Sequence, residues 1–279
     1  MFLKKIFKFF FYKLLNLINK NNQFIISIQK ISKKKFLNED YNESKKNLNI
    51  GSGGYSIEGF LDLDFVSERY TKVRTQNFIP YDIRKDKIPF NNNTVDNIFC
   101  SHVIEHIEEE YTRIFIKECS RVLKKNGVLR ITCPDSRFLY EMLTNDKRFY
   151  LQKRYFNWFL SRGVSFDEVD EIDCFIREIS TSKLRIFSDK NKFYYDFVKN
   201  NLTNYSKIIS ILSKDNKLDT KNIGNHISSY DFEKIKKISS NFFNRVIQSR
   251  FQASVSQDMR SKSFDNTCPE MSMYVDLVK

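Results

Sequence analysis

The stretch from Asn47 to Asp64 constrains the fold of this chain more than any other. A short apolar run, Leu48 to Ile50, leads into three glycines at positions 51, 53 and 54, and a second apolar run ends on the carboxylate of Asp64. In an open α/β sheet, ligands bind outside the carboxyl ends of the strands. Glycines there let the backbone approach a nucleotide, and an acid can hold ribose hydroxyls. The stretch therefore predicts half of a nucleotide pocket.

Further apolar runs predict strands that alternate with a helix. The predicted strands cover residues 47–51, 60–64, 76–83, 95–101 and 128–132. Three glutamates at 108–110 enrich a helix start, and Lys124-Lys125-Asn126-Gly127 has the basic last turn and glycine of a helix C-terminus. Strands alternating with a helix imply a mainly parallel sheet, so the expected fold class is α/β.

Residues 136–225 lack this alternation of strands with a helix, and they predict an inserted helical cap. Helical patterns there fall near 137–160, 165–180 and 190–212. After the insertion, the sequence predicts a helix over 230–241, a strand over 245–253 and a last strand over 271–278. The predicted domains are a basic arm at 1–38, a core formed by 47–135 and 226–279, and the insertion at 136–225.

The formal net charge of +13 is concentrated at the N-terminus. Residues 1–38 hold nine lysines and no acid, so only four of the thirteen charges belong to the rest of the chain. The folded part is therefore only mildly basic. This excludes a nucleic-acid groove spread over the domain, and we expect no nucleic-acid partner.

Residues 2–20 place an apolar, phenylalanine-rich stripe opposite lysines on a helical wheel. Lys8 and Lys13 interrupt any run near the ~20 apolar residues that a membrane span needs, and no small-residue cleavage site follows. Two interpretations stay open. The helix could lie in the headgroup layer of an anionic membrane, or it could dock on the domain or on a partner through its apolar stripe.

The five cysteines are odd in number and scattered, with no Cys-x-x-Cys pair for zinc or redox chemistry. They are typical of buried thiols in a reducing compartment. We therefore expect a cytoplasmic protein, peripheral on the inner membrane face if the arm binds lipid.

Four pieces, in this order, resemble the class I S-adenosylmethionine-dependent methyltransferases, and most closely a bacterial branch found among surface-polysaccharide and small-molecule enzymes. The pieces are Leu48-Asn49-Ile50-Gly51-Ser52-Gly53-Gly54, Gly59-Phe60-Leu61-Asp62-Leu63-Asp64, Asp82 to His106, and Arg121 to Asp135. The tail from His226 to Lys279 is similar to the closing hairpin of that branch. The resemblance implies a Rossmann-like, mostly parallel seven-stranded sheet with a C-terminal antiparallel hairpin strand, and S-adenosyl-L-methionine as cofactor.

The resemblance also implies a set of cofactor-binding residues. The glycine loop at 51–53 would lie under the amino-acid part of the cofactor, and the acid at 64 would grip the ribose. Residues 82 and 83 would flank the adenine, and residues 101 and 102 would form the floor. The implied set is Asn49, Gly51, Ser52, Gly53, Asp64, Asp82, Ile83, Ser101 and His102.

Two departures from the family pattern matter. The second position of the glycine motif often carries an acid, and here it is Asn49, which weakens a role for this side chain in binding the methionine ammonium. In addition, Asp64 follows Gly51 by only 13 residues. The first crossover helix must therefore be short or absent. A nicotinamide-dinucleotide fold needs ~20 residues between the glycines and the ribose acid, and a glycine or alanine where Ser56 stands, so that class is excluded.

His102 to His106 reads His-Val-Ile-Glu-His and matches the pattern of inverted zinc proteases. Such a site needs the run inside a helix and a third ligand. Here the run directly follows an apolar strand, so we expect no metal and interpret His106 as a hydrogen-bonded structural histidine.

We expect an S-adenosylmethionine-dependent methyltransferase that acts on a small molecule or glycan, by O-methylation, as in polysaccharide biosynthesis. The insertion would close over the acceptor. His106 and Asp135 are the nearest candidates for a base, but neither is assigned, so the catalytic residue stays unknown. The alternative is a non-catalytic, methyltransferase-like binding module at a membrane surface. Nucleic-acid methylation has only the charge in its favour, because the chain lacks the Asn/Asp-Pro-Pro-aromatic tetrapeptide of amino-methylating DNA enzymes.

Overall fold

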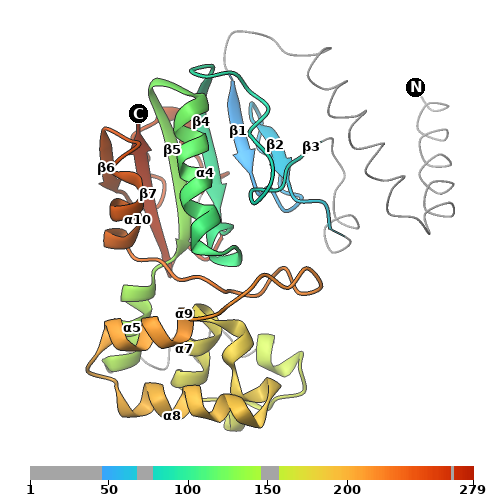
Figure 1. Cartoon of the computed structure of the whole chain (residues 1–279), viewed down its shortest axis with the longest axis vertical. Coiled ribbons are helices and arrows are strands. Elements are labelled where there is room, and N and C mark those ends of the chain that lie inside the picture. The colour runs from blue at the N-terminus through green and yellow to red at the C-terminus, as the bar shows by residue number, and fades with distance from the viewer. Residues whose placement is uncertain (1–45, 68–77, 146–156, 265–266) are drawn as a thin grey trace, which may run out of the picture.

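A computed structural model describes residues 46–67, 78–145, 157–264 and 267–279 (Figure 1). The predicted basic arm at 1–38 lies outside these residues, as do positions 76–77 of the predicted third strand and positions 146–156 within the first helical piece of the insertion.

Seven strands form one mixed sheet in the order β3-β2-β1-β4-β5-β7-β6. Neighbouring strands from β3 through β5 pair in parallel, whereas β7 runs antiparallel between β5 and β6. The predicted α/β, Rossmann-like sheet with an antiparallel C-terminal strand is therefore confirmed. The strands are β1 Asn47–Ile50, β2 Leu61–Asp64, β3 Ile79–Pro80, β4 Val95–Ser101, β5 Leu123–Pro134, β6 Arg245–Gln248 and β7 Ser272–Val278.

The strand order places a topological switch point between β1 and β4. From β1 the chain winds outward through β2 to β3, and then returns to the other side of β1 to build β4 and β5. In open α/β sheets, ligands bind outside the carboxyl ends of the strands at such a point. The strand order therefore predicts that a ligand binds beside the residues that follow β1, β2 and β4.

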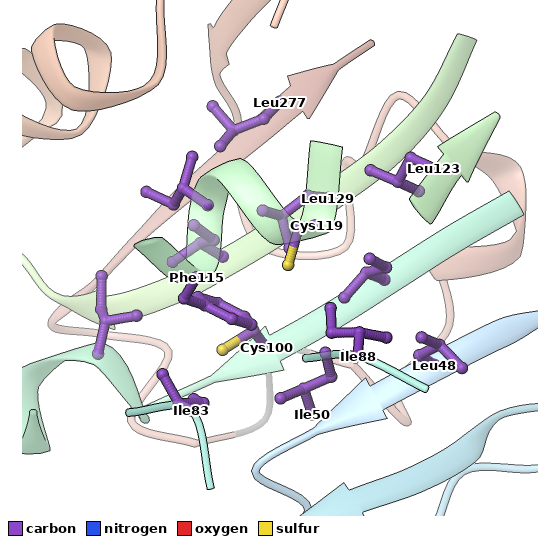
Figure 2. Close-up of a cluster of buried hydrophobic side chains, with 14 of the residues drawn as sticks. Leu48, Ile50, Ile83, Ile88, Cys100, Phe115, Cys119, Leu123, Leu129 and Leu277 are labelled. Atoms are coloured by element: carbon purple, nitrogen blue, oxygen red, sulfur yellow. The ribbon is translucent and has the colours of Figure 1, made fainter. Parts of the chain in front are cut away.

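Helix α4 (Glu109–Val122) covers one face of the sheet together with α10 (Phe232–Ser239). Two glutamates in the first turn and Arg121 in the last complement the helix dipole. The buried residues Phe115, Ile116, Cys119 and Val122 recur at a spacing of three or four and therefore face the sheet. Figure 2 shows Phe115 and Cys119 against side chains of β1, β4, β5 and β7, where they form the main hydrophobic core.

The predicted C-terminus of this helix is wrong. The helix ends at Val122, and β5 begins at Leu123, so Lys124 to Gly127 belong to an irregular start of the strand where the register against β4 shifts. The residue in the left-handed region is Asn126, with φ 65°. Gly127 is small because a Cβ there would lie 2.9 Å from the Lys124 carbonyl oxygen and 3.0 Å from the Asp96 carbonyl oxygen.

The expected short or absent crossover helix is confirmed, because residues 51–60 connect β1 to β2 as an irregular loop without a helix. The face of the sheet opposite α4 is covered by irregular segments. Ile57 and Phe60 of this loop pack there with Phe99, Met259 and Phe264. The loop is thereby held against the sheet by apolar contacts of its own.

A group of helices follows β5 and lies beyond the carboxyl ends of the parallel strands (Figure 1). It has its own hydrophobic cluster, centred on fully buried residues such as Leu139, Phe175 and Leu212. The predicted helical pieces are broken into shorter elements than expected. These are α5 Ser136–Thr144, η2 Phe166–Glu168, α7 Glu171–Ile179, η3 Thr181–Lys183, η4 Arg185–Phe187, η5 Asp189–Asn191, α8 Lys192–Asn200 and α9 Tyr205–Ser213.

Polar side chains set the start of several of these helices. The Asp170 carboxylate accepts bonds from the backbone amides of Ile172 and Asp173, and the Asp173 carboxylate accepts one from the amide of Asp170, which completes a capping box at α7. Asp231 caps α10 in a similar way by accepting a bond from the Lys234 amide at 2.8 Å.

Two short elements complete the described chain. η1 (Ile104–His106) follows β4, and η6 (Gln257–Met259) precedes β7. The predicted strand over 245–253 is shorter than expected and ends at Gln248. Within the described ranges, the helices are too short or too polar to cross a lipid bilayer.

Candidate active site

A cavity opens at the carboxyl ends of β1, β2, β3 and β4, the position that the strand order indicates. The space between its walls, open solvent at the mouth included, is about 650 Å³. Six of the nine predicted cofactor residues line it: Gly51, Gly53, Asp64, Asp82, Ile83 and His102.

Gly51 ends β1 and turns the chain over the cavity. Its φ of 75° lies in the left-handed region, and its amide donates a 2.7 Å hydrogen bond to the Leu63 carbonyl oxygen of β2. A Cβ at this position would lie 2.1 Å from Cγ2 of Val103, which follows β4. Only glycine therefore lets the β1 loop and the β4 loop approach each other here.

Asp64 ends β2 and faces the glycine loop. Its Oδ2 accepts a 2.7 Å hydrogen bond from the Gly53 amide and a longer one, 3.4 Å, from the Ser52 hydroxyl. Its Oδ1 accepts a 2.7 Å bond from the amide of Phe65. The predicted ribose acid and the predicted glycine loop are therefore in direct contact at the wall of one cavity.

Asp82 and Ile83 follow β3 and form the side of the cavity. The Asp82 carboxylate accepts two hydrogen bonds from the Arg84 guanidinium, Nε to Oδ1 at 3.1 Å and Nη2 to Oδ2 at 3.0 Å. The charge of Asp82 is thus neutralised by a residue that also lines the cavity. Sequence reasoning missed Arg84, although an arginine two residues after an acid is compatible with such a pair.

Ser101 and His102 end β4. The Ser101 hydroxyl accepts a 2.7 Å hydrogen bond from the Thr132 hydroxyl of β5, and Ser101 does not line the cavity. His102 does line it, with a φ of 52°, and its Nε2 lies 2.8 Å from the Ser272 hydroxyl. The predicted floor therefore consists of His102, while Ser101 ties β4 to β5.

Asn49 and Ser52 also lie outside the cavity lining. Asn49 is buried, and its side-chain amide donates to the Tyr55 carbonyl oxygen at 2.9 Å and to Asp62 Oδ1 at 2.8 Å. This side chain joins both ends of the glycine loop to β2. Its place in the structure explains why an amide suits the position: an amide can donate to a neighbouring carboxylate, and an acid cannot.

The far wall of the cavity comes from η1 and from the insertion, which the sequence analysis expected to close over the acceptor without naming the residues that do so. His106 of η1 and the insertion residues Leu218 and Ile223 line this wall. Figure 1 shows the segment after α9 running between the sheet and the helical group. The insertion residues follow the glycine loop by more than 160 positions, and their pattern carries no signal that relates them to it.

Asp135, the other candidate base, caps a helix. Its Oδ1 accepts hydrogen bonds from the amides of Arg137 at 3.0 Å and Phe138 at 3.2 Å, at the start of α5. Burial raises the pKa of Asp135, although these two bonds oppose the shift. It does not line the cavity.

The cavity suits an adenosine-containing cofactor by the chemistry of its walls. It offers a carboxylate, Asp64, beside a loop whose glycines leave the backbone open to a ligand. The aliphatic and aromatic side chains Ile50, Phe65 and Ile83 supply apolar surface for a purine ring.

Comparison with known proteins gives one family match. Residues 61–131 match the model of a methyltransferase domain family. The matched segment runs from the start of β2 into β5 and contains Asp64, Asp82 and His102. No curated protein matches the chain.

Among solved structures, the chain is similar to a SAM-dependent methyltransferase from Archaeoglobus fulgidus, with 13% identity, a TM-score of 0.42, and 93% of this chain and 100% of that chain covered. For a SAM-dependent methyltransferase from Aquifex aeolicus, the identity is 14% and the TM-score 0.37, with 88% of each chain covered. For a protein from Pyrococcus horikoshii OT3, the identity is 23% and the TM-score 0.30, with 44% of this chain covered, so that the chain spans 64% of that protein's length.

The family match and the cavity fall on the same part of the chain. Residues 61–131 are similar to a methyltransferase domain, and this segment includes the cavity residues Asp64, Asp82 and His102. The finer resemblance to a surface-polysaccharide branch and the residue roles stay predictions.

Proposed function

We propose that this chain is an S-adenosylmethionine-dependent methyltransferase that methylates a hydroxyl of a small molecule or glycan. One observation carries the proposal: the glycine loop after β1 and the carboxylate that ends β2 line the same cavity and touch each other at 2.7 Å. The family match over residues 61–131 supports the class of reaction.

The residues of this chain would hold the donor as follows. Asp64 would accept hydrogen bonds from the ribose hydroxyls, and the loop at Gly51 and Gly53 would let the amino-acid part lie against the backbone. Ile83 and Phe65 would contact the adenine. S-adenosylmethionine supplies a methyl carbon on a positively charged sulfur, which leaves as a neutral thioether.

Catalysis by this chain would consist mainly of positioning. Methyl transfer is an in-line displacement in which the new O–C bond forms as the C–S bond breaks, so the walls must hold three atoms in a line and exclude water. A base near the acceptor would take the hydroxyl proton. His102 and His106 are the histidines that line the cavity. Burial is the largest influence on the pKa of His106 and lowers it, which leaves a neutral imidazole near neutral pH.

The insertion supports a small acceptor. Leu218 and Ile223 bring apolar side chains over the side of the cavity away from the glycine loop, so the acceptor would enter a walled site. The predicted domain division at 136–225 assigns these two residues to the cap. A flat, basic surface of the kind that a nucleic-acid substrate needs is not expected from the mild charge of the folded part.

The N-terminal segment at 1–38 supports a proposal about where in the cell the enzyme acts. Its nine lysines and aromatic stripe would attach the enzyme to an anionic inner membrane face, where a lipid-linked or surface-glycan acceptor is built. The five cysteines, all without disulfides, support a reducing compartment such as the cytoplasm. Equal partitioning of the full chain and a chain lacking residues 1–38 onto anionic vesicles would remove the membrane proposal.

The activity can be tested without knowing the acceptor. Methyl-labelled S-adenosylmethionine is incubated with the protein and a fractionated cell extract, with Asp64→Ala as the inactive control. The proposal expects label in the small-molecule or glycan fraction, in a linkage stable to mild base as an ether is. Label in nucleic acid would contradict the acceptor class. No transfer with any fraction, together with no donor binding, would favour the binding-module alternative.

A further inference from the structure

All three histidines of this chain gather around one buried glutamate. Glu105 lies in η1 with 2% of its surface exposed. His102 Nδ1 is 3.0 Å from Glu105 Oε1, and His106 Nε2 is 4.0 Å from the same oxygen. His226 joins from the segment that follows the insertion, and its ring packs edge-on against that of His106 with centroids 4.9 Å apart. One ligand atom each from Glu105, His106 and His226 lies within 4.8 Å of the other two.

The hydrogen bonds of two histidines fix which ring nitrogen is free. His106 Nδ1 donates to the Asn225 carbonyl oxygen at 3.0 Å, and His226 Nδ1 donates to the Glu178 carbonyl oxygen at 2.7 Å. A carbonyl oxygen can only accept, so both Nδ1 atoms carry the proton and both Nε2 atoms keep a lone pair. Metal-binding histidines show this arrangement, in which the second nitrogen donates to a backbone carbonyl and orients the ring.

The glutamate supplies a buried carboxylate with few partners. Apart from the 3.0 Å contact between its Oε1 and His102 Nδ1, neither carboxylate oxygen of Glu105 has a hydrogen-bond partner within the described part of the chain. Leaving a buried carboxylate in this state is costly unless a cation is near.

The backbone holds these groups in place independently of any ligand. The amides of Ile227 and Ser228 donate to the Glu105 carbonyl oxygen at 2.8 and 3.1 Å. The His226 amide donates to the Thr181 hydroxyl at 2.9 Å. The ligand atoms thus come from η1 and from a segment that main-chain hydrogen bonds anchor to η1. The backbone therefore positions these side chains before any metal binds.

We propose that Glu105, His106 and His226 bind one divalent transition-metal ion with the coordination preferences of zinc. Two neutral imidazoles and one carboxylate suit such an ion, whose bonds to these atoms are about 2.0–2.2 Å long. The side chains would close by small rotations from their present separation. Three protein ligands leave one position of a tetrahedral ion for a water or another oxygen ligand.

This site is not the zinc-protease pattern that the sequence contains. In that pattern the two histidines of His-Val-Ile-Glu-His share a helix face, whereas here His102 lies at the end of β4 and points to Ser272. The third ligand, His226, is 120 positions from His106, and a lone histidine gives no signal in the sequence. The expectation of no metal rested on the position of the run directly after a strand, and not inside a helix as a zinc protease needs.

The ion would join the sheet to the insertion beside the cofactor cavity. His106 lines the cavity, and the Nδ1 partner of His226 is the carbonyl of Glu178 in α7. Binding would therefore lock α7 and the segment after α9 against η1. Metal binding does not depend on methyl transfer, so the metal site can be tested independently of the proposed function.

The test is a metal titration of the full chain, prepared without a histidine tag and stripped with a chelator. Zn²⁺ binding is measured by calorimetry, and Co²⁺ is used to report the coordination geometry by its visible absorption. We expect one equivalent bound, a tetrahedral Co²⁺ spectrum and a higher melting temperature with metal. Glu105→Gln, His106→Gln and His226→Gln should each weaken binding by roughly 100-fold or more, since loss of outer-shell partners alone costs 10–100-fold.

Two controls keep the result interpretable. Cys268 is the one cysteine that is not buried, so Cys268→Ser tests adventitious thiol binding and should leave the Zn²⁺ affinity unchanged. Circular dichroism establishes that each variant is folded. The proposal is overturned if folded wild-type protein binds no Zn²⁺, if the three ligand variants bind as well as wild type, or if Cys268→Ser abolishes binding.

Discussion

The backbone amide of Gly53 donates a 2.7 Å hydrogen bond to the carboxylate of Asp64. This bond joins the loop after β1 to the end of β2, and both residues line one cavity. The carboxylate is thus already turned toward the loop that would carry the amino-acid part of a nucleoside cofactor. Asn49 and the Ser52 hydroxyl reinforce the arrangement from outside the cavity.

Replacing Gly51 with alanine should damage both stability and cofactor binding. The new Cβ would stand 2.1 Å from Val103 Cγ2, on a backbone with φ 75°. Overpacking of this kind costs about 1–3 kcal/mol, and the left-handed backbone adds ~1 kcal/mol. Urea unfolding and titration with S-adenosylhomocysteine measure the two effects.

Gly59→Ala is the matched control, because Gly59 has a similar φ of 79° but no atom within 4 Å of the added Cβ. It should lose only the ~1 kcal/mol of backbone strain and keep full binding. In the background of Gly51→Ala, Val103→Ala should restore part of the stability. Equal effects of the two glycine substitutions on binding would contradict the close approach inferred here.

Asn49→Asp should weaken the site, although an acid is often found at this place in the family that the sequence resembles. The Asn49 amide now donates to Asp62 at 2.8 Å and to the Tyr55 carbonyl oxygen. An aspartate would put two carboxylates together and remove both donors, at a cost of about 1–3 kcal/mol. We expect a lower melting temperature and weaker S-adenosylhomocysteine binding. Tighter binding by the aspartate variant would show instead that the position contacts the cofactor.

Glu118 should stabilise the fold in a pH-dependent manner. Its carboxylate accepts bonds from the Ile88 amide at 2.9 Å and from the Arg121 guanidinium, and so ties α4 to the turn before β4. Although burial opposes the shift, the bonds and charge of Arg121 hold the pKa of Glu118 below its ordinary value of 4.5. A lowered folded-state pKa contributes stability that is present above 4.5 and is lost as the pH falls through the lowered value.

Glu118→Gln should therefore destabilise the protein by about 1–2 kcal/mol near pH 7, and the difference from wild type should shrink as the pH falls below about 4.5. Denaturant unfolding at several pH values measures it. Glu110→Gln, an exposed position on the same helix, should change the stability by no more than about 0.5 kcal/mol at any pH. A constant difference across this range for Glu118→Gln would mean that packing, and not charge, is what the residue supplies.

Apolar runs in the sequence correctly predicted three strands of the sheet. The apolar runs before Gly51 and Asp64 and the run at 95–101 are strands, because they are buried and end in residues that suit the carboxyl edge of a parallel sheet. The pattern misled at Lys124 to Gly127, where basic residues and a glycine imitate a helix end. Gly127 is small because the backbones of two strands approach there.

The predictable part of the site lies at the ends of the strands. The family resemblance implied Gly51, Gly53, Asp64, Asp82, Ile83 and His102, and all six line the cavity. Leu218, Ile223 and His226 come from segments placed by the packing of the insertion, and no spacing links them to the glycine loop. Asn49 acts through Asp62, which the fold brings near, whereas Arg84 pairs with Asp82 only two positions before it.

The central claim is that the glycine loop and Asp64 bind one adenosine, and calorimetric titration with S-adenosylhomocysteine tests it most directly. We predict stoichiometric binding by wild type, weakened roughly 10- to 100-fold in Asp64→Ala by the loss of charge-assisted hydrogen bonds. Asp96→Asn, at the opposite end of β4 where the carboxylate pairs with Lys124, should bind as wild type does. No binding by folded wild type, or equal binding by Asp64→Ala, would contradict the account.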